Sequence, residues 1–409
     1  MFQDTKNIYH LIISLIANAL LRFPSRGLRV IGVTGTDGKT TTSSMIYHVL
    51  NEQGLNPSLI SSVGAFIGNK KYDVGFHVTT PTPSNLPRFI EKAKKEKSKF
   101  LVLEVTSHAL DQNRTWGINF EIGVLTNVTN EHLDYHKTYE RYVKAKFKLL
   151  KKSETAILNK DDNSFKYVKE LKNNIVTYGI KNKADITPES LPFEIKIPGE
   201  FNKYNALAAI AVLKELGLTD EQIKSGINSF KLPIGRMEQV YKGNFSIMID
   251  FAHTANSFEQ LLSSIRGDVK GRIIHVFGAA GKRDFAKRPE MGRNSSKYAD
   301  IIVLTAEDPR DEPIDNICLQ IEEGIDKKFK YLDYKTYEDN IKNKRIYFKI
   351  PSRREAIGFA ISIAKKGDLI IATGKSHEQS MNYGKGEEPW DEFGVAREAL
   401  REKLDHENK

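Results

Sequence analysis

One segment, residues 31–41, constrains the fold more than any other part of the chain. It reads Ile-Gly-Val-Thr-Gly-Thr-Asp-Gly-Lys-Thr-Thr and lies between an apolar run, 28–33, and a helical pattern, 40–52. Glycines in such a loop let successive backbone N–H groups face a phosphate, and the helix start adds positive potential. Lys39 can reach the outer phosphates of a nucleotide, and the hydroxyl of Thr40 can bind Mg²⁺. The segment predicts a variant nucleotide-binding loop, since Val33 stands where the usual spacing has glycine.

The order of strand and helix patterns predicts two α/β units. Short β-branched runs alternate with helical segments, which is the rhythm of a doubly wound, mostly parallel sheet. A break at 231–235 separates two such series. We therefore expect an N-terminal helix in residues 1–27, a nucleotide-binding domain in 28–231 and a Rossmann-like α/β domain in 232–409. The expected strands are 28–33, 99–105 and 122–127, then 245–250, 272–277, 300–304, 345–349 and 368–372.

The charge balance leaves several classes of partner open. The chain carries 62 Lys and Arg against 52 Asp and Glu, a net charge of +10, which suits nucleic acid, a membrane surface or an anionic substrate. The basic run 91–99 interleaves both signs without aromatic residues, so we interpret it as a solvated helix face. No recognition motif supports nucleic acid. The one cysteine, Cys318, predicts a reducing compartment, the cytoplasm, and a metal site of oxygen or imidazole ligands.

An apolar helix is predicted near the start of the chain. Apolar residues at 8, 11, 12, 15, 16, 19, 20 and 23 follow helical spacing and form one stripe. The segment is too short to span a bilayer. We expect a helix that packs through this stripe, and a helix lying on a membrane surface is the alternative.

Polar residues follow two of the predicted strands. Glu104 lies at the end of the strand 99–105, and the segment 130–136 with His132 follows the strand 122–127. Open α/β sheets bind their ligands at the carboxyl ends of strands, so both groups are expected beside the nucleotide loop. Taken singly, each histidine is more often a hydrogen-bonded surface residue than a ligand.

Eight motifs occur in a defined order along the chain. They are 30–42; Thr79-Thr80-Pro81; 104–108 with Gln112 and Arg114; 132–136; Phe201-Asn202 with Asn205-Ala206; 235–238; 250–254; and 374–378. In these motifs, over about residues 28–400, the chain resembles the Mur ligases, which are ATP-dependent, amide-forming enzymes of peptidoglycan synthesis. It most resembles the tripeptide synthetases among them, which add the third residue to UDP-N-acetylmuramoyl-L-alanyl-D-glutamate.

The resemblance implies a central P-loop ATPase domain, a C-terminal ligase domain and a reaction through an acyl phosphate. ATP phosphorylates the side-chain carboxylate of the acceptor's D-Glu, and the amine of an incoming amino acid displaces phosphate. Lys39 is expected to stabilise the γ-phosphate. One Mg²⁺ is expected on Thr40 and Glu104, and a second on Glu104 and His132. A further ligand would be the carbamate of Lys146, which ends a Tyr-x-x-Ala-Lys pattern. The alternative for Lys146 is an ordinary surface lysine.

Two sets of substrate-binding residues follow from the same matching. The nucleotide is expected to contact Gly35, Thr36, Asp37, Gly38, Lys39, Thr40, Thr41, Asn202, Arg236, Asp250 and His253. A capping or hinge role is the alternative for Asp250. The muramoyl dipeptide is expected to contact Thr79, Thr80, Thr106, Gln112 and Arg114, and the guanidinium of Arg114 can donate paired hydrogen bonds to a carboxylate or phosphate.

The incoming amino acid is expected to contact Arg283, Asp308, Arg310, Gly374 and Glu378. Family members that use meso-diaminopimelate carry Asp-Asn-Pro-Arg, whose Arg pairs with the distal carboxylate, and members that use L-lysine usually lack that Arg. The corresponding residues here are Glu-Asp-Pro-Arg, 307–310. Arg310 favours meso-diaminopimelate, because a bidentate guanidinium without a carboxylate would be left unpaired. Asp308 in place of Asn adds an anion, which weakens this argument and could favour L-lysine.

The usual family members have a domain of about a hundred residues ahead of the nucleotide loop, which holds the UDP group. About 28 residues precede the loop here. We expect a monomeric ligase of a UDP-muramoyl dipeptide, or a related carrier, and a diamino acid, with no nucleic-acid partner and no membrane span. Two alternatives stay open: a ligase with another acceptor, as in folylpolyglutamate synthetases, and a nucleotide-dependent binding protein.

Overall fold

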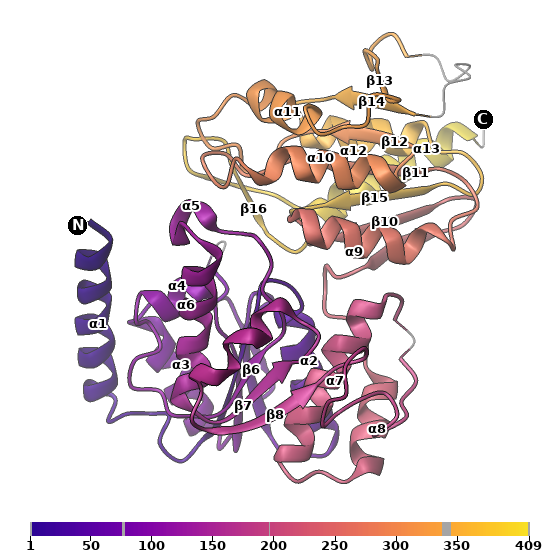
Figure 1. Cartoon of the computed structure of the whole chain (residues 1–409). Helices are drawn as coiled ribbons and strands as arrows, with labels where there is room; N and C mark the ends of the chain where they lie inside the picture. The colour runs from indigo at the N-terminus through magenta and orange to yellow at the C-terminus, as the bar shows by residue number, and fades with distance from the viewer. Residues whose placement is uncertain (1, 76–77, 196, 338–344, 408–409) are drawn as a thin grey trace. The chain divides into compact units, whose positions relative to one another are not determined.

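Two separate β-sheets organise the chain (Figure 1). The computed structural model describes residues 2–75, 78–195, 197–337 and 345–407. Contacts divide the chain into unit 1, Met1–Pro233, and unit 2, Ile234–Lys409. Each unit has a sheet and helices of its own.

The sheet of unit 1 is mostly parallel, as predicted. Its strands are β1 (Arg29–Thr34), β2 (Pro57–Ser61), β3 (Gly64–Ile67), β4 (Lys70–Tyr72), β5 (Phe100–Glu104), β6 (Phe120–Leu125), β7 (Ser153–Asn159) and β8 (Asn174–Tyr178). They lie in the order β4-β3-β2-β5-β1-β6-β7-β8. The six strands from β2 to β8 in this order are parallel, and β3 and β4 form an antiparallel edge.

Helices cover both faces of this sheet because alternate residues of β1 point to opposite sides. Ile31 and Val33 share a core with residues of α2 and α7, and Val30 shares another with residues of α3, α4 and α6. The helices of unit 1 beyond the first are α2 (Lys39–Glu52), α3 (Asn85–Lys95), α4 (Ser107–Asp111), α5 (Leu133–His136), α6 (Tyr139–Lys152), the 3₁₀ helix η1 (Asn163–Glu170), α7 (Glu200–Glu215) and α8 (Asp220–Ser229).

The strand order places the candidate site. β1 lies between β5 and β6 and is parallel to both, so the carboxyl ends of these three strands meet at one edge of the sheet. The nucleotide loop follows β1, Glu104 ends β5 and Thr126 follows β6. Segments about 70 to 90 residues apart in sequence are thereby brought together, as the rule for open α/β sheets predicts.

The first helix, α1 (Phe2–Leu20), runs along the outside of unit 1 next to α3 (Figure 1). The helix is present as predicted, but the expectation that it packs through its apolar stripe is wrong. Ser14 and Asn18 are buried against unit 1, whereas Ile12 and Ile16 are about half exposed. The polar residues hydrogen-bond to backbone carbonyls of unit 1, and this fixes which face of the helix turns outward.

Unit 2 is a second, mostly parallel α/β sheet. Its strands are β9 (Glu238–Lys242), β10 (Ser246–Asp250), β11 (Ile273–Phe277), β12 (Ile301–Leu304), β13 (Lys330–Tyr331), β14 (Ile346–Lys349) and β15 (Leu369–Thr373), in the order β13-β14-β12-β11-β15-β10-β9. Within the described part of this seven-stranded sheet, only β9 pairs antiparallel. The five strands predicted from the sequence are present within one residue of their expected ends.

The remaining elements of unit 2 complete the Rossmann-like arrangement. Its helices are α9 (Ala255–Arg266), α10 (Lys287–Tyr298), α11 (Ile314–Glu322), α12 (Arg353–Ser362) and α13 (Glu392–Glu407), and a two-stranded ribbon joins β16 (Ser380–Asn382) to β17 (Glu387–Pro389). Within the residues that the structure describes, no helix combines the length and apolar character needed to cross a membrane.

Candidate functional site

Two glycines of the nucleotide loop lie so close to neighbouring side chains that no other residue would fit in their place. Gly35 has φ 154°, and a Cβ atom there would lie 1.8 Å from Oγ1 of Thr126. Gly38 has φ 81°, and a Cβ atom there would lie 2.2 Å from Oδ1 of Asn205. No side chain fits at either position, so the loop backbone stays bare at the start of α2, where N–H groups can reach a phosphate.

The loop is braced from the segment after β6. The backbone N–H of Asp37 donates to Oδ1 of Asn127 at 3.0 Å, and Oγ1 of Thr126 donates to the carbonyl of Asp37 at 2.6 Å. Thr36 is buried, and its Oγ1 accepts from the N–H of Thr129 at 3.0 Å. The sequence predicted the loop residues but not these braces, which come from about 90 residues further along the chain.

Lys39 and Thr41 lie at the start of α2. Nζ of Lys39 donates to the carbonyl of Thr36 at 2.8 Å, so the ammonium folds back over the loop that it is expected to serve. Thr41 is buried in the first turn of the helix. A lysine beside a glycine-rich loop at the start of a helix is the arrangement expected for binding phosphate oxygens.

Thr40 and Glu104 form the core of the candidate metal site. Oγ1 of Thr40 lies 3.1 Å from both carboxylate oxygens of Glu104, a side chain that is 1% exposed. Ser62, which the sequence analysis missed, adds an N–H donor to Glu104 at 3.1 Å and a hydroxyl 3.0 Å from Thr40. A carboxylate and a hydroxyl are hard oxygen donors, and Mg²⁺ takes one or two protein carboxylates together with phosphate oxygens and waters, so the group fits this ion.

Lys146 is not a surface lysine. The side chain is 1% exposed, and Nζ donates to the carbonyl of Gly35 at 2.6 Å, inside the nucleotide loop. Burial, followed by the charge of Lys39, holds the pKa of this amine well below its usual value, against the opposing effect of Glu131. The neutral amine is the form that can react with CO₂, so the environment favours the nucleophile that a carbamate requires.

His132 lies in a cluster of rings rather than in a compact ligand set. Its backbone has φ 55°, and its ring centroid is 5.0 Å from that of His108 and 6.0 Å from that of Tyr142. Neighbouring His136 is buried, which lowers its pKa to about 4, and its Nε2 lies 3.0 Å from Oγ of Ser107. Among the residues that the structure describes, no three His, Cys, Asp or Glu side chains are grouped as a metal site.

The predicted acceptor residues form one connected group. Oγ1 of Thr80 donates to the backbone carbonyl of Glu104 at 3.0 Å and accepts from the N–H of Thr106 at the same distance. Arg114 donates to Oε1 of Gln112 from Nε at 2.9 Å and from Nη2 at 2.6 Å, and from Nη1 to the carbonyl of Thr80 at 3.4 Å. The structure thus brings these four together, and Thr79, half-buried, precedes Thr80 in the chain.

Asn202 is linked to the nucleotide loop by a hydrogen bond to Asn205, which lies against the loop. The side chain of Asn202 is buried and accepts from Nδ2 of Asn205 at 3.2 Å, one turn along α7. Asn205 in turn lies against Gly38 and accepts from Oγ1 of Thr42 at 3.4 Å. Asn205 stood in a recognised motif but was not among the predicted contacts, because its link to the loop spans more than 160 residues.

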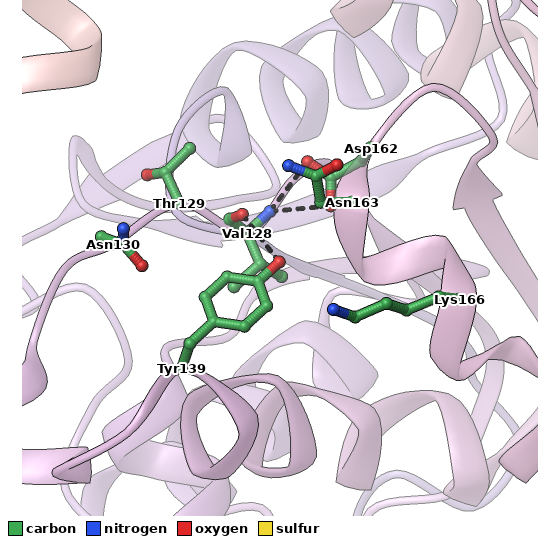
Figure 2. Close-up of a pocket in the computed structure, with 7 residues that line it drawn as sticks. All are labelled: Val128, Thr129, Asn130, Tyr139, Asp162, Asn163 and Lys166. Atoms are coloured by element: carbon green, nitrogen blue, oxygen red, sulfur yellow. Dashed lines mark hydrogen bonds between the residues drawn. The ribbon is translucent and has the colours of Figure 1, made fainter.

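A hollow of about 560 Å³ lies beside the loop braces, and the sequence analysis did not anticipate it (Figure 2). The backbone N–H of Val128 donates to the carboxylate of Asp162, and Tyr139 Oη donates to the Val128 carbonyl at 3.3 Å. Burial raises the pKa of Asp162, and hydrogen bonds from Ser164 and Val128, followed by the charge of Lys146, oppose that effect. The hollow is lined by Val128, Thr129, Asn130, Tyr139, Asp162, Asn163 and Lys166.

In unit 2 the predicted nucleotide residues meet at the carboxyl end of β10. Asp250 accepts from the backbone N–H groups of Met237 and Ala252, both at 2.7 Å. Burial raises the pKa of Asp250, and the nearby Arg236 opposes the rise. The guanidinium of Arg236 lies 4.6 Å from the ring centroid of Phe251, and Nδ1 of His253 lies 2.8 Å from the carbonyl of Phe251. These hydrogen bonds fit the capping or hinge role that was the alternative for Asp250, and its contact with the nucleotide stays a prediction.

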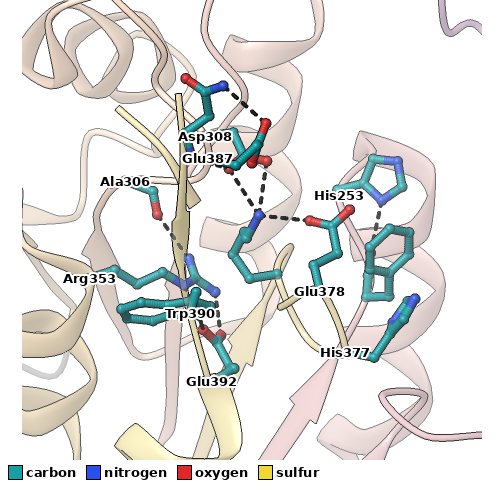
Figure 3. Close-up of polar contacts among 12 residues, drawn as sticks. His253, Ala306, Asp308, Arg353, His377, Glu378, Glu387, Trp390 and Glu392 are labelled. Atoms are coloured by element: carbon teal, nitrogen blue, oxygen red, sulfur yellow. Dashed lines mark hydrogen bonds and ion pairs between the residues drawn. The ribbon is translucent and has the colours of Figure 1, made fainter. Parts of the chain in front are cut away.

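A buried lysine that the sequence analysis did not single out joins two predicted amino-acid contacts (Figure 3). Nζ of Lys375 lies 2.9 Å from both carboxylate oxygens of Asp308 and 2.8 Å from Oε2 of Glu378. Lys375 is completely buried. Asp308 also accepts from the backbone N–H of Asn382 at 2.9 Å. Its carboxylate oxygens therefore bond to donors of the protein itself.

Arg310 and Gly374 lie in the same region of unit 2, at backbone positions with positive φ. Nη1 of Arg310 donates to the carbonyl of Gly281 at 2.8 Å, an uncharged acceptor. At Gly374, with φ 105°, a Cβ atom would lie 2.4 Å from Oε2 of Glu307, so only glycine fits. Oε2 of Glu307 is buried without a hydrogen-bond partner, and burial raises the pKa of this carboxyl to about 8. Arg283 is exposed.

An ion pair braces the strands that carry these residues. Arg353 and Glu392 are both fully buried, and the guanidinium donates to the carboxylate from Nε at 2.9 Å and from Nη2 at 2.5 Å (Figure 3). The remaining donors of Arg353 reach the carbonyls of Ala306, after β12, and Thr373, at the end of β15. The pair therefore sets the spacing between the segments that contain Asp308 and Lys375.

Comparisons with known proteins agree over nearly the whole chain. Residues 33–213 match the Mur ligase middle domain, and residues 235–376 match the model described as Mur ligase, glutamate ligase domain. The chain is 37% identical over 401 residues to the Clostridium acetobutylicum protein named UDP-N-acetylmuramoyl-L-alanyl-D-glutamate--2,6-diaminopimelate ligase 1, an alignment that covers 93% of this chain and 79% of that relative.

Solved structures show the same likeness. One of a UDP-N-acetylmuramoyl-L-alanyl-D-glutamate--2,6-diaminopimelate ligase is similar with a TM-score of 0.58 at 27% identity, covering 93% of this chain and 79% of that chain. Folylpolyglutamate synthase of Mycobacterium tuberculosis, solved with ADP and AMPPCP, is similar with a TM-score of 0.68 at 15% identity and covers 95% of both chains. At that identity the second likeness shows the fold alone.

Proposed function

This chain belongs to the Mur ligase family, and we propose that it is the ATP-dependent ligase that joins meso-2,6-diaminopimelate to the D-glutamate side chain of UDP-N-acetylmuramoyl-L-alanyl-D-glutamate. The product is a precursor of peptidoglycan. Relatives at 33–37% identity over most of the chain carry this ligase name. We assign the reaction to the cytoplasm, in keeping with the one cysteine, Cys318, which is free and buried.

One residue, Glu104, carries the assignment of the phosphoryl-transfer site through two contacts. The side chain of Glu104 meets Thr40 of the nucleotide loop, while the backbone carbonyl of the same residue accepts from Thr80 of the acceptor group. The end of β5 therefore joins the residues expected to hold the γ-phosphate to those expected to hold the carboxylate that receives it. Holding two reactants in line in this way is the main contribution that a protein makes to phosphoryl transfer.

The reaction has two steps. An oxygen of the D-glutamate carboxylate attacks the γ-phosphorus of ATP, and ADP leaves. The amine nitrogen of the incoming amino acid then attacks the acyl carbon, phosphate leaves and the nitrogen gives up a proton. Mg²⁺, for which Thr40 and Glu104 offer oxygen ligands, supplies charge neutralisation when bound. Lys39 and the bare backbone of the loop bind and orient the phosphates.

Lys146 is proposed to act as a carbamate. Its burial, its contact with the loop carbonyl of Gly35 and its lowered pKa support a neutral amine that reacts with CO₂. Protein labelled with ¹³C-bicarbonate should give a carbamate carbonyl NMR signal that is absent in Lys146→Met. Lys144→Met, at an exposed lysine of the same helix, is the matched control and should keep the signal. A signal that persists in Lys146→Met rules out carbamylation at this residue.

The choice of diaminopimelate rests on Arg310. Asp308 was the feature that weakened the case for a carboxylate-bearing substrate, and it is paired inside the protein with Lys375, a cation that it shares with Glu378. The guanidinium of Arg310 is hydrogen-bonded to an uncharged carbonyl, and its nearby carboxylate, Asp311, is exposed and paired with Lys282, so Arg310 can meet an anionic group of the substrate. A substrate with a distal carboxylate therefore fits this site better than L-lysine.

A matrix of acceptors and amines tests the function. UDP-N-acetylmuramoyl-L-alanyl-D-glutamate or a folate acceptor would be combined with meso-diaminopimelate, L-lysine or L-glutamate, with phosphate release and product mass as readouts. We expect ATP-dependent product only from the muramoyl dipeptide, and fastest with diaminopimelate. Faster turnover with L-lysine contradicts the amine assignment alone, and glutamate added to a folate replaces the proposed function altogether.

A further inference from the structure

α1 turns an apolar stripe toward solvent, made by Ile8, Tyr9, Ile12, Leu15, Ile16 and Leu20. Residues three and four apart share one face of a helix, so these side chains lie together from Ile8 to the end of α1. Contiguous exposed apolar patches of several hundred Å² are rare on monomeric proteins and mark interaction sites. The exposed fractions are 59% for Ile8, 61% for Tyr9, 51% for Ile12, 44% for Leu15, 50% for Ile16 and 77% for Leu20.

The opposite face of α1 is polar, and unit 1 holds it in place. Oγ of Ser14 donates to the carbonyl of Asn113 at 3.0 Å, and Nδ2 of Asn18 donates to the carbonyl of Trp116 at 2.9 Å. Gly117 approaches so closely that a Cβ atom there would lie 3.0 Å from Asn18. Rolling the helix inward would break these buried hydrogen bonds, each of which is costly to leave unmade. The stripe therefore faces outward because of the packing of its own helix.

Basic residues flank the stripe. Lys6 lies in the first half of α1, and Arg22 and Arg26 follow its end; all three are exposed. In sequence, Asp4 is the one acidic residue among the first 28. An apolar helical face bordered by cationic side chains is the pattern of helices that lie in the plane of a membrane, with the basic groups at the anionic headgroups.

We propose that the α1 stripe is a docking surface for an anionic lipid bilayer, on which the helix lies without crossing it. A second copy of the chain fits less well. In a two-fold symmetric pair of α1 helices, parallel or antiparallel, the basic ends of one copy would oppose basic ends of the other. A single pair of 19-residue helices also falls short of the roughly 1,200 Å² that a stable interface buries.

Docking through α1 would also place the acceptor site near the lipid. Asn7 donates to Asp111 at 3.3 Å and Gln3 to Tyr135 at 2.5 Å, and Tyr135 accepts from the acceptor residue Gln112 at 3.5 Å. α1, a helix about 10 Å in diameter, lies between that group and the exposed stripe. This consequence rests on the proposed function, whereas the docking surface itself does not.

Vesicle flotation of the full chain tests the proposal, with no substrate present. Vesicles of phosphatidylglycerol and phosphatidylcholine would be compared with vesicles of phosphatidylcholine alone. We expect the protein to float with the anionic vesicles, and Ile12→Gln combined with Ile16→Gln to lower the partition coefficient about tenfold or more. Leu319→Gln on α11, a leucine also 50% exposed, is the matched control and should leave flotation unchanged. Lys6→Gln should weaken binding about fivefold.

Three results would overturn the proposal. The first is no flotation of the unchanged protein, and the second is equal flotation of the variant with Ile12→Gln and Ile16→Gln. The third is a dimer in analytical ultracentrifugation that is lost in this variant, while the unchanged protein does not bind vesicles. The substituted side chains are exposed, so circular dichroism and thermal melting should match those of the unchanged protein. Ligase activity in solution, measured without vesicles, should be the same in both proteins. The two readouts are therefore independent: failure of flotation counts against the docking surface alone, and failure of ligation counts against the proposed function alone.

Discussion

Nζ of Lys375 lies 2.9 Å from both carboxylate oxygens of Asp308, in a position where the lysine is completely buried. The two residues are 67 positions apart in the chain, and Glu378 completes the group at 2.8 Å from the same nitrogen. This cation offsets one of the two carboxylate charges, and that offset helps a site expected to bind a carboxylate to contain an aspartate. Without it, the buried Asp308 and the half-buried Glu378 would both lose their ion-pair partner.

Removing Lys375 should therefore harm both stability and amine binding. In Lys375→Met we expect the free energy of unfolding to fall by about 3–5 kcal/mol, because buried carboxylates lose their partner, and the KM for diaminopimelate to rise about tenfold or more. Adding Asp308→Asn should recover part of both losses. Denaturant unfolding and steady-state kinetics are the measurements. Lys282→Met, which breaks the exposed pair with Asp311, is the control and should cost under about 1 kcal/mol. A double variant no better than Lys375→Met contradicts the compensation.

Arg310 should decide between amines. We expect Arg310→Leu to lower kcat/KM for diaminopimelate by about 10²–10³-fold and to change the value for L-lysine far less, since a site built for a carboxylate loses its charged donor. Competition between the two amino acids, read by product mass, measures the ratio directly. Arg354→Leu, on the exposed arginine paired with Glu398, serves as control. An equal loss for both amines would assign Arg310 a structural role.

Glu104 should be needed for chemistry rather than for folding. Glu104→Gln keeps the shape and a hydrogen-bond acceptor for Thr40 but removes the negative charge. We expect kcat to fall by about 10²–10³-fold, with ATP binding retained. Single-turnover phosphate release and nucleotide titration separate the two effects. Glu121→Gln, on the partly exposed ion pair with Arg29, should leave kcat unchanged. Near-normal turnover of Glu104→Gln would remove this residue from the metal site.

Glu307 should make stability depend on pH. Burial raises the pKa of its carboxyl from 4.5 to about 8, so between these values the folded chain keeps a proton that the unfolded chain has lost. The free energy of unfolding contributed by this group is complete below pH 4.5 and is lost as the pH rises to about 8. Glu307→Gln cannot ionise, and we expect it to be more stable than the unchanged protein by about 2–4 kcal/mol at about pH 9 and equal to it at about pH 4.

A glutamate with the opposite shift provides the comparison for that experiment. Burial acts to raise the pKa of Glu322, but hydrogen bonds from Tyr347 and Lys349 lower it overall. Its stabilising contribution is present above the unfolded value of 4.5 and is lost as the pH falls through the folded value. Glu322→Gln should thus lose stability at neutral pH and match the unchanged protein in acid. Denaturant unfolding across the pH range would show opposite slopes for the two variants.

Features that depend on neighbours in sequence were predicted well. Local glycines, apolar runs and turn residues predicted the glycine-rich loop after β1 and the two mostly parallel sheets. The ends of the predicted strands differ from the observed ends by at most two residues. The resemblance to Mur ligases rested on ordered motifs, and the family matches confirm it. Lys375 lay inside one of these motifs, but nothing local indicated that its partner would be Asp308.

The first helix shows most clearly what periodicity leaves undecided. The sequence determined that residues near the start of the chain form a helix with one apolar stripe. Only the tertiary structure decided that Ser14 and Asn18 face unit 1 and the stripe faces outward, because that choice depends on carbonyls of Asn113 and Trp116, about a hundred residues away. Helical spacing fixes which side chains share a face, whereas the partners that a face meets depend on contacts between distant segments, and those form only when the chain folds.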